Sequence, residues 1–269
     1  MPLVTLLSRL VPILDGFVHY GNPLDIAFKR AFAKNGLVTI LDRNTKVVVS
    51  AKVRSYQMFG ETWYNHDYDV PGCPLRNDDY VIDIGANQGF YSCYAASQGA
   101  RVSAFEPFPE SWARLCANVE RNGFAPRVKT SNVAVSAASG KATLLSSEFL
   151  GGGANTIVKD HALSVGEDFT PSLEVTTVTL DAILADIAGA IRICKMDCEG
   201  SEYNILRSFS KPSRIDSFAI EFHPGAYSVR DLVEVISSWG THQVSFAKKG
   251  NILYAVRNEI VCQHADSCQ

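Results

Sequence analysis

The feature that most constrains this chain is a short glycine-rich segment, Val81–Phe90, which carries the pattern D-x-G-x-N-x-G. Apolar residues precede the pattern, as in a buried strand, and a helical spacing of apolar residues follows it. A second apolar strand, Arg101–Phe105, then ends at Glu106, 21 residues after Gly85. This order is typical of a nucleotide-binding βαβ unit, in which the turn approaches the ligand and the acid accepts hydrogen bonds from ribose hydroxyls.

The positions of the glycines in the turn indicate which class of nucleotide it binds. A dinucleotide fingerprint, G-x-G-x-x-G, needs glycine at the positions that hold Asn87 and Phe90. Asp83, just before the turn, is expected to place a carboxylate beside the ligand, where it repels a pyrophosphate and suits a cation. S-adenosylmethionine fits this expectation, because it has a ribose, a sulfonium and an ammonium group and no phosphate. An ordinary βα turn without a ligand is the plain alternative, and the trailing acid argues against it.

From Tyr80 onward, segments with strand and helix patterns alternate, and the chain finishes in a hairpin. This order predicts a doubly wound α/β fold, with a mostly parallel seven-stranded sheet and an antiparallel last strand. The arrangement is Rossmann-like and typical of class I methyltransferases. The expected strands are Tyr80–Ile84, Arg101–Phe105, Val128–Val135, Lys141–Ser146, Ile191–Met196, Ile215–Phe222, Gln243–Ala247 and Ile252–Val256; the expected helices are Gly89–Gln98, Pro109–Asn122, Thr179–Ile187, Glu202–Phe209 and Val229–Trp239.

The first 75 residues are expected to form an extension that contributes to a substrate pocket or a dimer contact. It has helical patterns at Leu3–Val11 and Leu24–Lys34 and a hairpin pattern at Leu37–Leu41 and Val47–Val53. Residues 76–258 would be the catalytic domain and 259–269 a C-terminal tail. The glycine-rich segment Glu148–Pro171 is expected to be a mobile loop or flap.

Composition narrows the class of partner. A net charge of −3 gives no strong field that would attract nucleic acid. The N-terminal apolar stretch is too short to span a membrane, and it lacks the features of a signal peptide. The seven cysteines include no C-x-x-C pair, which favours a reducing, cytoplasmic location and argues against structural zinc.

Charged residues gather where two predicted strands end. Asp197 and Glu199 follow one strand, and Glu221 and His223 end the next. Such groups at the mouth of one sheet are costly unless they are paired or functional. We expect His223 to act as a general base, Glu221 to orient it or bind substrate, and Asp197 to bind the acceptor. Asp197, Glu221 and His223 could alternatively hold Mg²⁺ or Mn²⁺, whereas Glu202 fits a helix start that the helix dipole favours.

Several of these segments together resemble the FkbM family of methyltransferases. The most specific is Lys195–Glu202, which matches the family pattern K-[IM]-D-x-E-G-x-E. The others are Val81–Ser92, Phe105–Pro107, Asn132–Ser136 and Thr179–Asp181, and the resemblance extends from about Tyr80 to Val256. At Cys198 the family usually has isoleucine or valine, and at Ser201 it usually has alanine.

The resemblance implies transfer of a methyl group from S-adenosylmethionine, most often to a hydroxyl group of a sugar or secondary metabolite. N-methylation on the same fold is the first alternative, and an NAD-type oxidoreductase or an inactive binding module are alternatives of another class. The expected partner is a small-molecule acceptor, with a possible homodimer. The aromatic stretch from Tyr56 to Pro74 either forms a pocket wall or packs on the core. The expected cofactor-binding residues are Asp83, Gly85, Asn87, Gly89, Glu106 and Asn132; the expected substrate-binding residues are Trp63, Tyr64, His66 and Glu199.

Overall fold

The computed structural model describes residues 20–22, 24, 26, 36–146, 155–164, 170–223, 225–248 and 250–265. The predicted helix Leu3–Val11, nearly all of the predicted helix Leu24–Lys34 and the glycines at 151–153 lie outside these residues.

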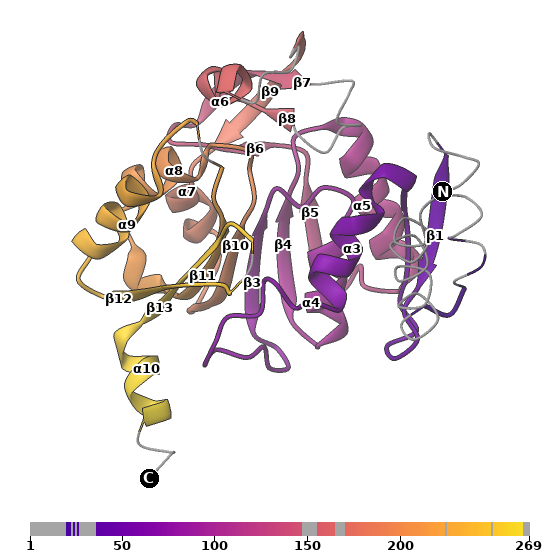
Figure 1. Cartoon of the computed structure of the whole chain (residues 1–269), viewed down its shortest axis with the longest axis horizontal. Helices are drawn as coiled ribbons and strands as arrows, with labels where there is room; N and C mark the ends of the chain where they lie inside the picture. Colours follow the sequence, from indigo (N-terminus) through magenta and orange to yellow (C-terminus); the bar gives the residue numbers. More distant parts are fainter. Residues whose placement is uncertain are drawn as a thin grey trace, which may run out of the picture.

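A seven-stranded sheet forms the centre of the molecule, in the order β12-β13-β11-β10-β3-β4-β5 (Figure 1). The strands from β11 to β5 pair in parallel, whereas β13 pairs antiparallel with both β11 and β12. The predicted doubly wound fold, with its hairpin strand reversed, is therefore confirmed. The strands are β3 Tyr80–Ile84, β4 Arg101–Phe105, β5 Val128–Ser131, β10 Ile191–Met196, β11 Ile215–Glu221, β12 His242–Phe246 and β13 Ile252–Arg257.

Helices cover both faces of this sheet, because side chains of each strand alternate between two cores. In β3, Val81 packs with α4 in one core, whereas Ile82 and Ile84 pack with α7, α8 and α9 in the other. Figure 1 shows α3, α4 and α5 on one side and α7, α8 and α9 on the other. These helices are α3 Tyr56–Trp63, α4 Phe90–Ser97, α5 Pro109–Arg121, α7 Leu180–Ala185, α8 Glu202–Ser208 and α9 Val229–Ser238.

A second, four-stranded sheet lies above the carboxyl ends of the central strands in Figure 1. Its order is β6-β9-β7-β8, and α6 follows β8. Three expectations for this region are wrong. The range Val128–Val135 divides between the two sheets, and β9 is a strand where none was expected. The expected loop Glu148–Pro171 contains β8, α6 and the first residues of β9. The elements are β6 Ala134–Val135, β7 Gly140–Ser146, β8 Asn155–Thr156, α6 Lys159–Ser164 and β9 Thr170–Val178.

The N-terminal hairpin has the predicted form and packs on the sheet domain through α5. Its strands are β1 Leu37–Leu41 and β2 Val48–Lys52, and a short η1, Val53–Ser55, leads into α3. The side chain of Asn118 exchanges two hydrogen bonds with the backbone of Ser50, and Asn122 does the same with Val48. The extension therefore shares one hydrophobic core with the α4 side of the sheet. The expected C-terminal tail instead begins with a helix, α10 Asn258–Ala265, and η2 Pro212–Arg214 precedes β11.

Candidate active site

The turn after β3 has the tight form that its sequence predicts. Gly85 has a φ of +75°, and a Cβ atom there would lie 1.7 Å from the carbonyl oxygen of Asp197. Only glycine fits this position, because β10 passes directly against the turn. Asn87 also has a left-handed φ, +49°, so it takes the place of a turn glycine as expected.

Glu106 is fixed beside this turn by two backbone amides. The N–H of Asn87 donates to Oε2 and that of Phe108 donates to Oε1, both at 2.8 Å. Burial raises the pKa of Glu106 to about 7, although the two backbone hydrogen bonds oppose the change. Because a carboxylate oxygen has two acceptor positions, each oxygen keeps one for a ligand hydroxyl.

Glu106 and the turn line a cleft of about 550 Å³ at the carboxyl ends of β3, β4 and β10. One part of its wall is apolar, and the part beside β10 carries the carboxylates Asp197 and Glu199. An apolar slot next to a carboxylate that can accept ribose hydroxyls suits a nucleoside. The lining residues from these strands and the turn are Ile84, Gly85, Asn87, Phe105, Glu106 and Pro107; Ala134, Val135, Leu144, Asn155, Ile157, Asp197, Cys198, Glu199 and Ser201 complete the cleft.

Asp83 lies beneath the turn and lines neither this cleft nor the second cleft described below. Its side chain is fully buried, accepts a 2.6 Å hydrogen bond from Ser92 Oγ and lies 3.3 Å from Lys195 Nζ. Lys195 also donates to the carbonyl oxygen of Gly85 at 2.8 Å. The expectation that Asp83 faces a cationic ligand was therefore wrong: Lys195 neutralises it, and Asp197 is the carboxylate that reaches the cleft.

Two other expected cofactor residues support the cleft from behind. The side-chain amide of Asn132 donates to the carbonyl oxygens of Glu106 and Pro107, both at 2.9 Å. Gly89 starts α4 with a φ of +88°. Neither residue lines the cleft, so the expected direct contact of Asn132 and Gly89 with a cofactor has no support here, and Ala134 and Val135 line the wall beyond Asn132 instead.

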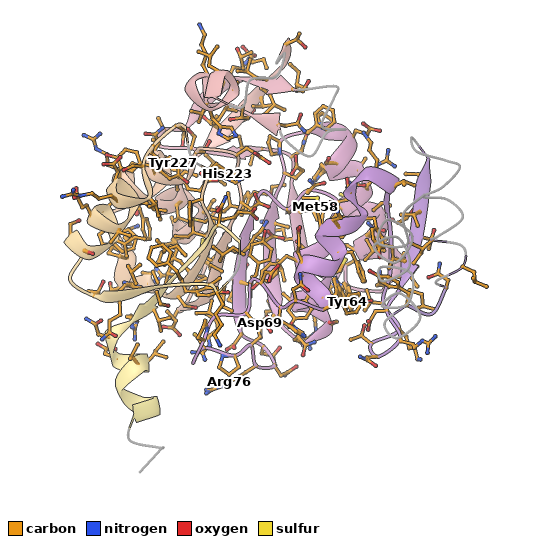
Figure 2. All side chains as sticks on the ribbon, in the orientation of Figure 1. Met58, Tyr64, Asp69, Arg76, His223 and Tyr227 are labelled. Carbon is orange, nitrogen blue, oxygen red and sulfur yellow. The ribbon has the colours of Figure 1, made fainter. Side chains whose placement is uncertain are left out.

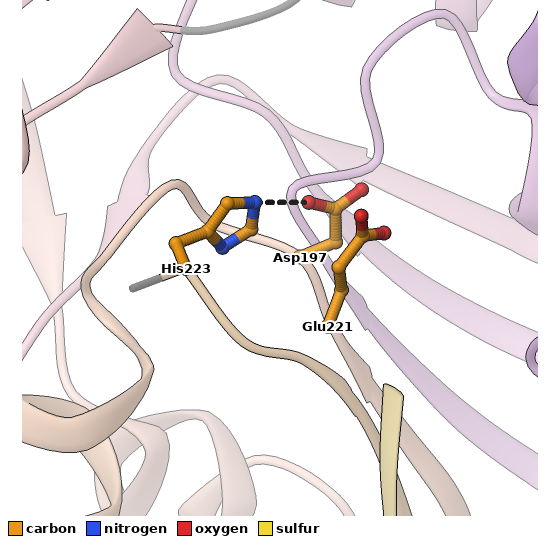
Figure 3. Close-up of side chains that lie close together, drawn as sticks. All are labelled: Asp197, Glu221 and His223. Atoms are coloured by element: carbon orange, nitrogen blue, oxygen red, sulfur yellow. Dashed lines mark ion pairs between the residues drawn. The ribbon is translucent and has the colours of Figure 1, made fainter. Parts of the chain in front are cut away.

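Asp197, Glu221 and His223 come together at the ends of β10 and β11 (Figure 3). One potential ligand atom from each lies within 4.8 Å of the other two. His223 Nε2 lies 3.6 Å from Asp197 Oδ1 and 3.5 Å from Glu199 Oε2. The other Asp197 oxygen lies 3.6 Å from Lys195 Nζ, so this carboxylate is placed between two basic side chains.

Glu202, and not Glu221, orients His223. Its carboxylate is fully buried and lies 3.0 Å from His223 Nδ1, while Tyr227 donates to it at 2.8 Å. The backbone amides of Cys198 and Gly200 donate to the same carboxylate. We had interpreted Glu202 only as a helix start, and its place in the K-M-D-C-E-G-S-E segment was the available signal for a further role.

The surroundings of this cluster raise the pKa values of both His223 and Glu221. Burial lowers the pKa of His223, but the hydrogen bond and charge of Glu202, with the charges of Glu199 and Asp197, outweigh burial and raise it to about 10. Burial and the charge of Asp197 raise the pKa of Glu221 to about 7, against a 2.5 Å hydrogen bond from Tyr68. His223 is therefore protonated at neutral pH, and Glu221 is near its midpoint.

A second cleft, of about 290 Å³, lies on the α3 side of the turn and shares Gly85, Asn87 and Asp197 with the first. Its other walls come from α3, α4, Tyr68 and Lys195. The two clefts therefore meet at the turn, with Asp197 facing both. The remaining lining residues are Met58, Glu61, Thr62, Ala86, Phe90 and Tyr91.

Three of the four expected substrate residues lie away from both clefts. Trp63 is buried, stacks on Phe59 at 5.1 Å and donates to the carbonyl oxygen of Phe90. Tyr64 packs against Tyr20 and Phe59 in the same core. His66 borders a separate open hollow of about 1100 Å³. Figure 2 shows Tyr64 well apart from His223 and Tyr227. Trp63 and Tyr64 therefore pack on the core, and of the four only Glu199 lines the larger cleft.

The segment that we expected to be a flap contacts the cluster through Glu199. Thr156 Oγ1 donates to the Glu199 carbonyl oxygen at 2.6 Å, and His161 Nε2 lies 3.3 Å from the Glu199 carboxylate. Asn155 and Ile157 from the same segment line the larger cleft. The described part of the segment therefore covers the cleft at its β10 side.

Comparison with known proteins agrees with this geometry. Residues 83–243 match the model of the methyltransferase FkbM domain. The chain is 27% identical over 208 residues to the 31-O-demethyl-FK506 methyltransferase FkbM of Streptomyces tacrolimicus, covering 68% of this chain and 80% of that protein. It is 26% identical over 168 residues to the hexuronic acid methyltransferase AglP of Haloferax volcanii, covering 60% and 63%.

Among solved structures, the precorrin-6y C5,15-methyltransferase of Geobacter metallireducens aligns with a TM-score of 0.41 and 14% identity over 76% of this chain and 88% of that one.

Within the described part of the chain, no helix has both the length and the hydrophobicity needed to cross a bilayer. The family match spans the turn, Glu106 and the charged strand ends at the larger cleft. The chain therefore belongs to the FkbM family of S-adenosylmethionine-dependent methyltransferases.

Proposed function

We propose that this methyltransferase transfers its methyl group to a hydroxyl group of a sugar or secondary metabolite. The observation that carries the proposal is that the cofactor cleft ends at Asp197, beside a cluster that can both hydrogen-bond a hydroxyl and accept its proton. The names of two relatives support it, because one specifies methylation at an oxygen and the other a hexuronic acid as substrate.

The cofactor's nucleoside would bind along the apolar wall of the larger cleft. Both oxygens of Glu106 keep an acceptor position for the ribose hydroxyls, and Phe105, Val135 and Leu144 offer apolar surface for the adenine. The sulfonium would then lie near the turn and Asp197, whose negative charge favours a cation. Asn132 and Lys195 would act indirectly, by holding the backbone at Glu106 and Gly85.

The acceptor would approach the methyl group from the side of Asp197, Glu221 and His223. Methyl transfer is an in-line displacement, and holding the acceptor oxygen about 3–3.5 Å from the methyl carbon supplies much of the acceleration. An alcohol must also lose its proton, and groups positioned to accept it contribute roughly 10²–10⁴-fold. The carboxylates of Asp197, Glu199 and Glu221 suit the several hydroxyls of a sugar, because each carboxylate oxygen accepts hydrogen bonds.

A divalent cation is the alternative use of the same three side chains, and their ligand atoms are close enough together for it. Lys195 and His223, however, already face the Asp197 carboxylate, and Tyr68 already donates to Glu221. The positive charge that a metal would bring is therefore already present, and the proposal contains no metal. Turnover after exhaustive chelation tests this choice: loss of activity that Mg²⁺ or Mn²⁺ restores would favour the cation.

The proposal is tested by mass spectrometry of glycosides and metabolite alcohols incubated with the enzyme and methyl-labelled S-adenosylmethionine. We expect a labelled product whose fragments carry the methyl group on oxygen, and a strongly reduced yield from Glu106→Ala. Labelling of amines alone would overturn the choice of hydroxyl acceptors and favour N-methylation. Calorimetry with S-adenosylhomocysteine separates a wrong acceptor from a failed cofactor site, because the cofactor product binds without any acceptor.

A further inference from the structure

The second cleft lies directly beside the place where the proposed cofactor position ends. It shares Gly85, Asn87 and Asp197 with the larger cleft, so the two clefts meet at the turn after β3. With the nucleoside in the larger cleft and the sulfonium near Asp197, the cofactor still has its amino-acid end to place. That end is a short carbon chain from the sulfur to an ammonium and a carboxylate group, and the cleft of about 290 Å³ is the space next to it.

Glu61, in α3, is an exposed acid that lines this cleft. In the part of the chain that the structure describes, its carboxylate has neither an ion pair nor a hydrogen-bond donor. Burial raises its pKa, and the charges of Asp67 and Asp197 raise it further, so these carboxylates lie close enough to repel one another. A cation between Glu61 and Asp197 would relieve this repulsion.

Lys195 also lines the cleft, but it does not supply that cation. Its ammonium group lies 3.3 Å from the fully buried Asp83 and donates to the carbonyl oxygen of Gly85 at 2.8 Å. It lies 3.6 Å from Asp197 and 5.2 Å from the centre of the Tyr68 ring. The charge of Lys195 therefore balances Asp83 behind the cleft, and the cleft itself keeps an excess of negative charge.

The start of α4 gives the same cleft a feature of opposite sign. Phe90 and Tyr91, the first two residues of this helix, line the cleft. The first hydrogen bond of the helix runs from the amide of Cys93 to the carbonyl oxygen of Gly89 at 2.9 Å, so the amides of Phe90 and Tyr91 have no partner within the helix. The helix dipole favours an anion at this end. A cleft with carboxylates and a helix start therefore matches a zwitterion, which is the form of an amino acid at neutral pH.

We propose that the second cleft binds the amino-acid end of S-adenosylmethionine, with Glu61 receiving the ammonium group and the start of α4 facing the carboxylate. This inference rests on the proposed function, through the position of the nucleoside in the larger cleft. The family match begins at residue 83, so Glu61 belongs to the N-terminal extension. The extension then completes the cofactor site through α3, in addition to packing on the sheet domain through α5.

Two ligands that differ only in the amino-acid end test the proposal without any acceptor. S-adenosylhomocysteine carries this end, whereas 5′-methylthioadenosine has the same adenosine and thioether sulfur with a methyl group in its place. Isothermal titration calorimetry compares both ligands on the natural protein and on Glu61→Gln. We expect the Kd for S-adenosylhomocysteine to rise roughly 10-fold, because a neutral amide binds an ammonium group less strongly than a carboxylate does. The Kd for 5′-methylthioadenosine should stay the same, which also shows that the variant is folded.

Glu61→Asp keeps the charge and should weaken S-adenosylhomocysteine less than Glu61→Gln does, and Glu120→Gln on the exposed face of α5 is the control. An unchanged Kd for S-adenosylhomocysteine in Glu61→Gln, or an equal fold-change for both ligands, would overturn the proposal. A raised KM for the acceptor with that Kd unchanged would place the acceptor in this cleft instead. A failed acceptor screen would not affect these measurements, whereas a natural protein that binds neither ligand would overturn this inference together with the proposed cofactor site.

Discussion

Replacing Glu106 by glutamine should make the stability of this protein less dependent on pH. Glu106 is buried, and its pKa is about 7 against an ordinary value of 4.5. Between these two values the unfolded chain releases the proton while the folded protein keeps it. The free energy of unfolding of the natural protein therefore falls as the pH rises from 4.5 to 7, and levels off above that.

The magnitude follows from the two pKa values. The difference between a pKa of about 7 and one of 4.5 lowers the free energy of unfolding by about 3 kcal/mol at high pH, since one pKa unit is about 1.4 kcal/mol. Glutamine removes this loss, but it has a single carbonyl oxygen for the two amides of Asn87 and Phe108. Leaving one buried donor poorly paired costs about 1–3 kcal/mol at every pH. We therefore expect Glu106→Gln to be less stable than the natural protein at pH 5 and equally or more stable at pH 8.

Urea denaturation at half-unit pH intervals from 5 to 8 measures this difference. Glu110→Gln is the control, because Glu110 lies nearby at the start of α5 and its hydrogen bond with Lys52, together with Arg114, holds its pKa below the ordinary value. Its contribution to stability is present above pH 4.5 and is lost only in stronger acid, so the stability difference between Glu110→Gln and the natural protein should stay constant from pH 5 to 8. If the stability difference between Glu106→Gln and the natural protein were the same at pH 5 and pH 8, the reasoning about the buried carboxylate would be refuted.

The same variant tests the role of Glu106 in cofactor binding. A hydrogen bond from a ribose hydroxyl to an ionised carboxylate contributes about 1.5–3 kcal/mol, against about 0.5–1.5 kcal/mol for a neutral amide, so two such bonds differ by about 2 kcal/mol. The Kd for S-adenosylhomocysteine should therefore rise roughly 10–100-fold in Glu106→Gln. In the natural protein the Kd should rise as the pH falls below 7, because the free site takes up a proton. Isothermal titration calorimetry at pH 8 and 5.5 measures both effects.

Three further substitutions separate structural roles from contacts with ligands. Gly85→Ala places a methyl group against the Asp197 carbonyl oxygen, so we expect a loss of roughly 3 kcal/mol or more in urea denaturation and no binding of S-adenosylhomocysteine in calorimetry. Trp63→Ala should cost about 3–5 kcal/mol of stability and leave the acceptor KM unchanged; an altered KM with normal stability would place Trp63 at the acceptor instead. Lys195→Met should cost about 3–5 kcal/mol by denaturation, since it leaves the buried Asp83 without a cation, and adding Asp83→Asn should recover part of the loss.

The central sheet could be predicted well because its strands are continuous apolar runs between turn residues. The ranges Tyr80–Ile84, Arg101–Phe105 and Ile191–Met196 were predicted with the bounds that the structure has. Such strands are buried on both faces, so their apolar pattern is strong. The second sheet has strands of two residues, β6 and β8, and a β9 in which threonines, a serine and a glutamate interrupt the apolar residues on both faces. Patterns of that length and polarity do not separate a strand from a loop.

The sequence also predicted which residues form the candidate site, but not which of their side chains contact one another. The rule that ligands bind at the carboxyl ends of parallel strands selected Glu106, Asp197 and His223. Which carboxylate faces which nitrogen depends on the directions of side chains in three separate elements. Glu202 reaches His223 only because α8 starts directly beside the end of β11, and spacing along the chain does not reveal such a contact.

Asp83 shows how two rules together distinguish acids that stabilise the fold from acids that face the cleft. One rule is that ligands bind at the carboxyl ends of parallel strands, and the other is that side chains alternate in direction along a strand. Asp83 is inside β3, two residues from Val81, and both side chains point to the α4 face, where Ser92 accommodates the carboxylate. Lys195 is its register partner on the neighbouring strand β10, so its ammonium group reaches the same buried face. The acids that reach the cleft, Glu106 and Asp197, each follow the last residue of a strand. At that point the chain leaves the sheet and is no longer covered by the helices on its faces. An acid inside a buried strand therefore indicates a partner on the next strand, and an acid just after the strand indicates a ligand.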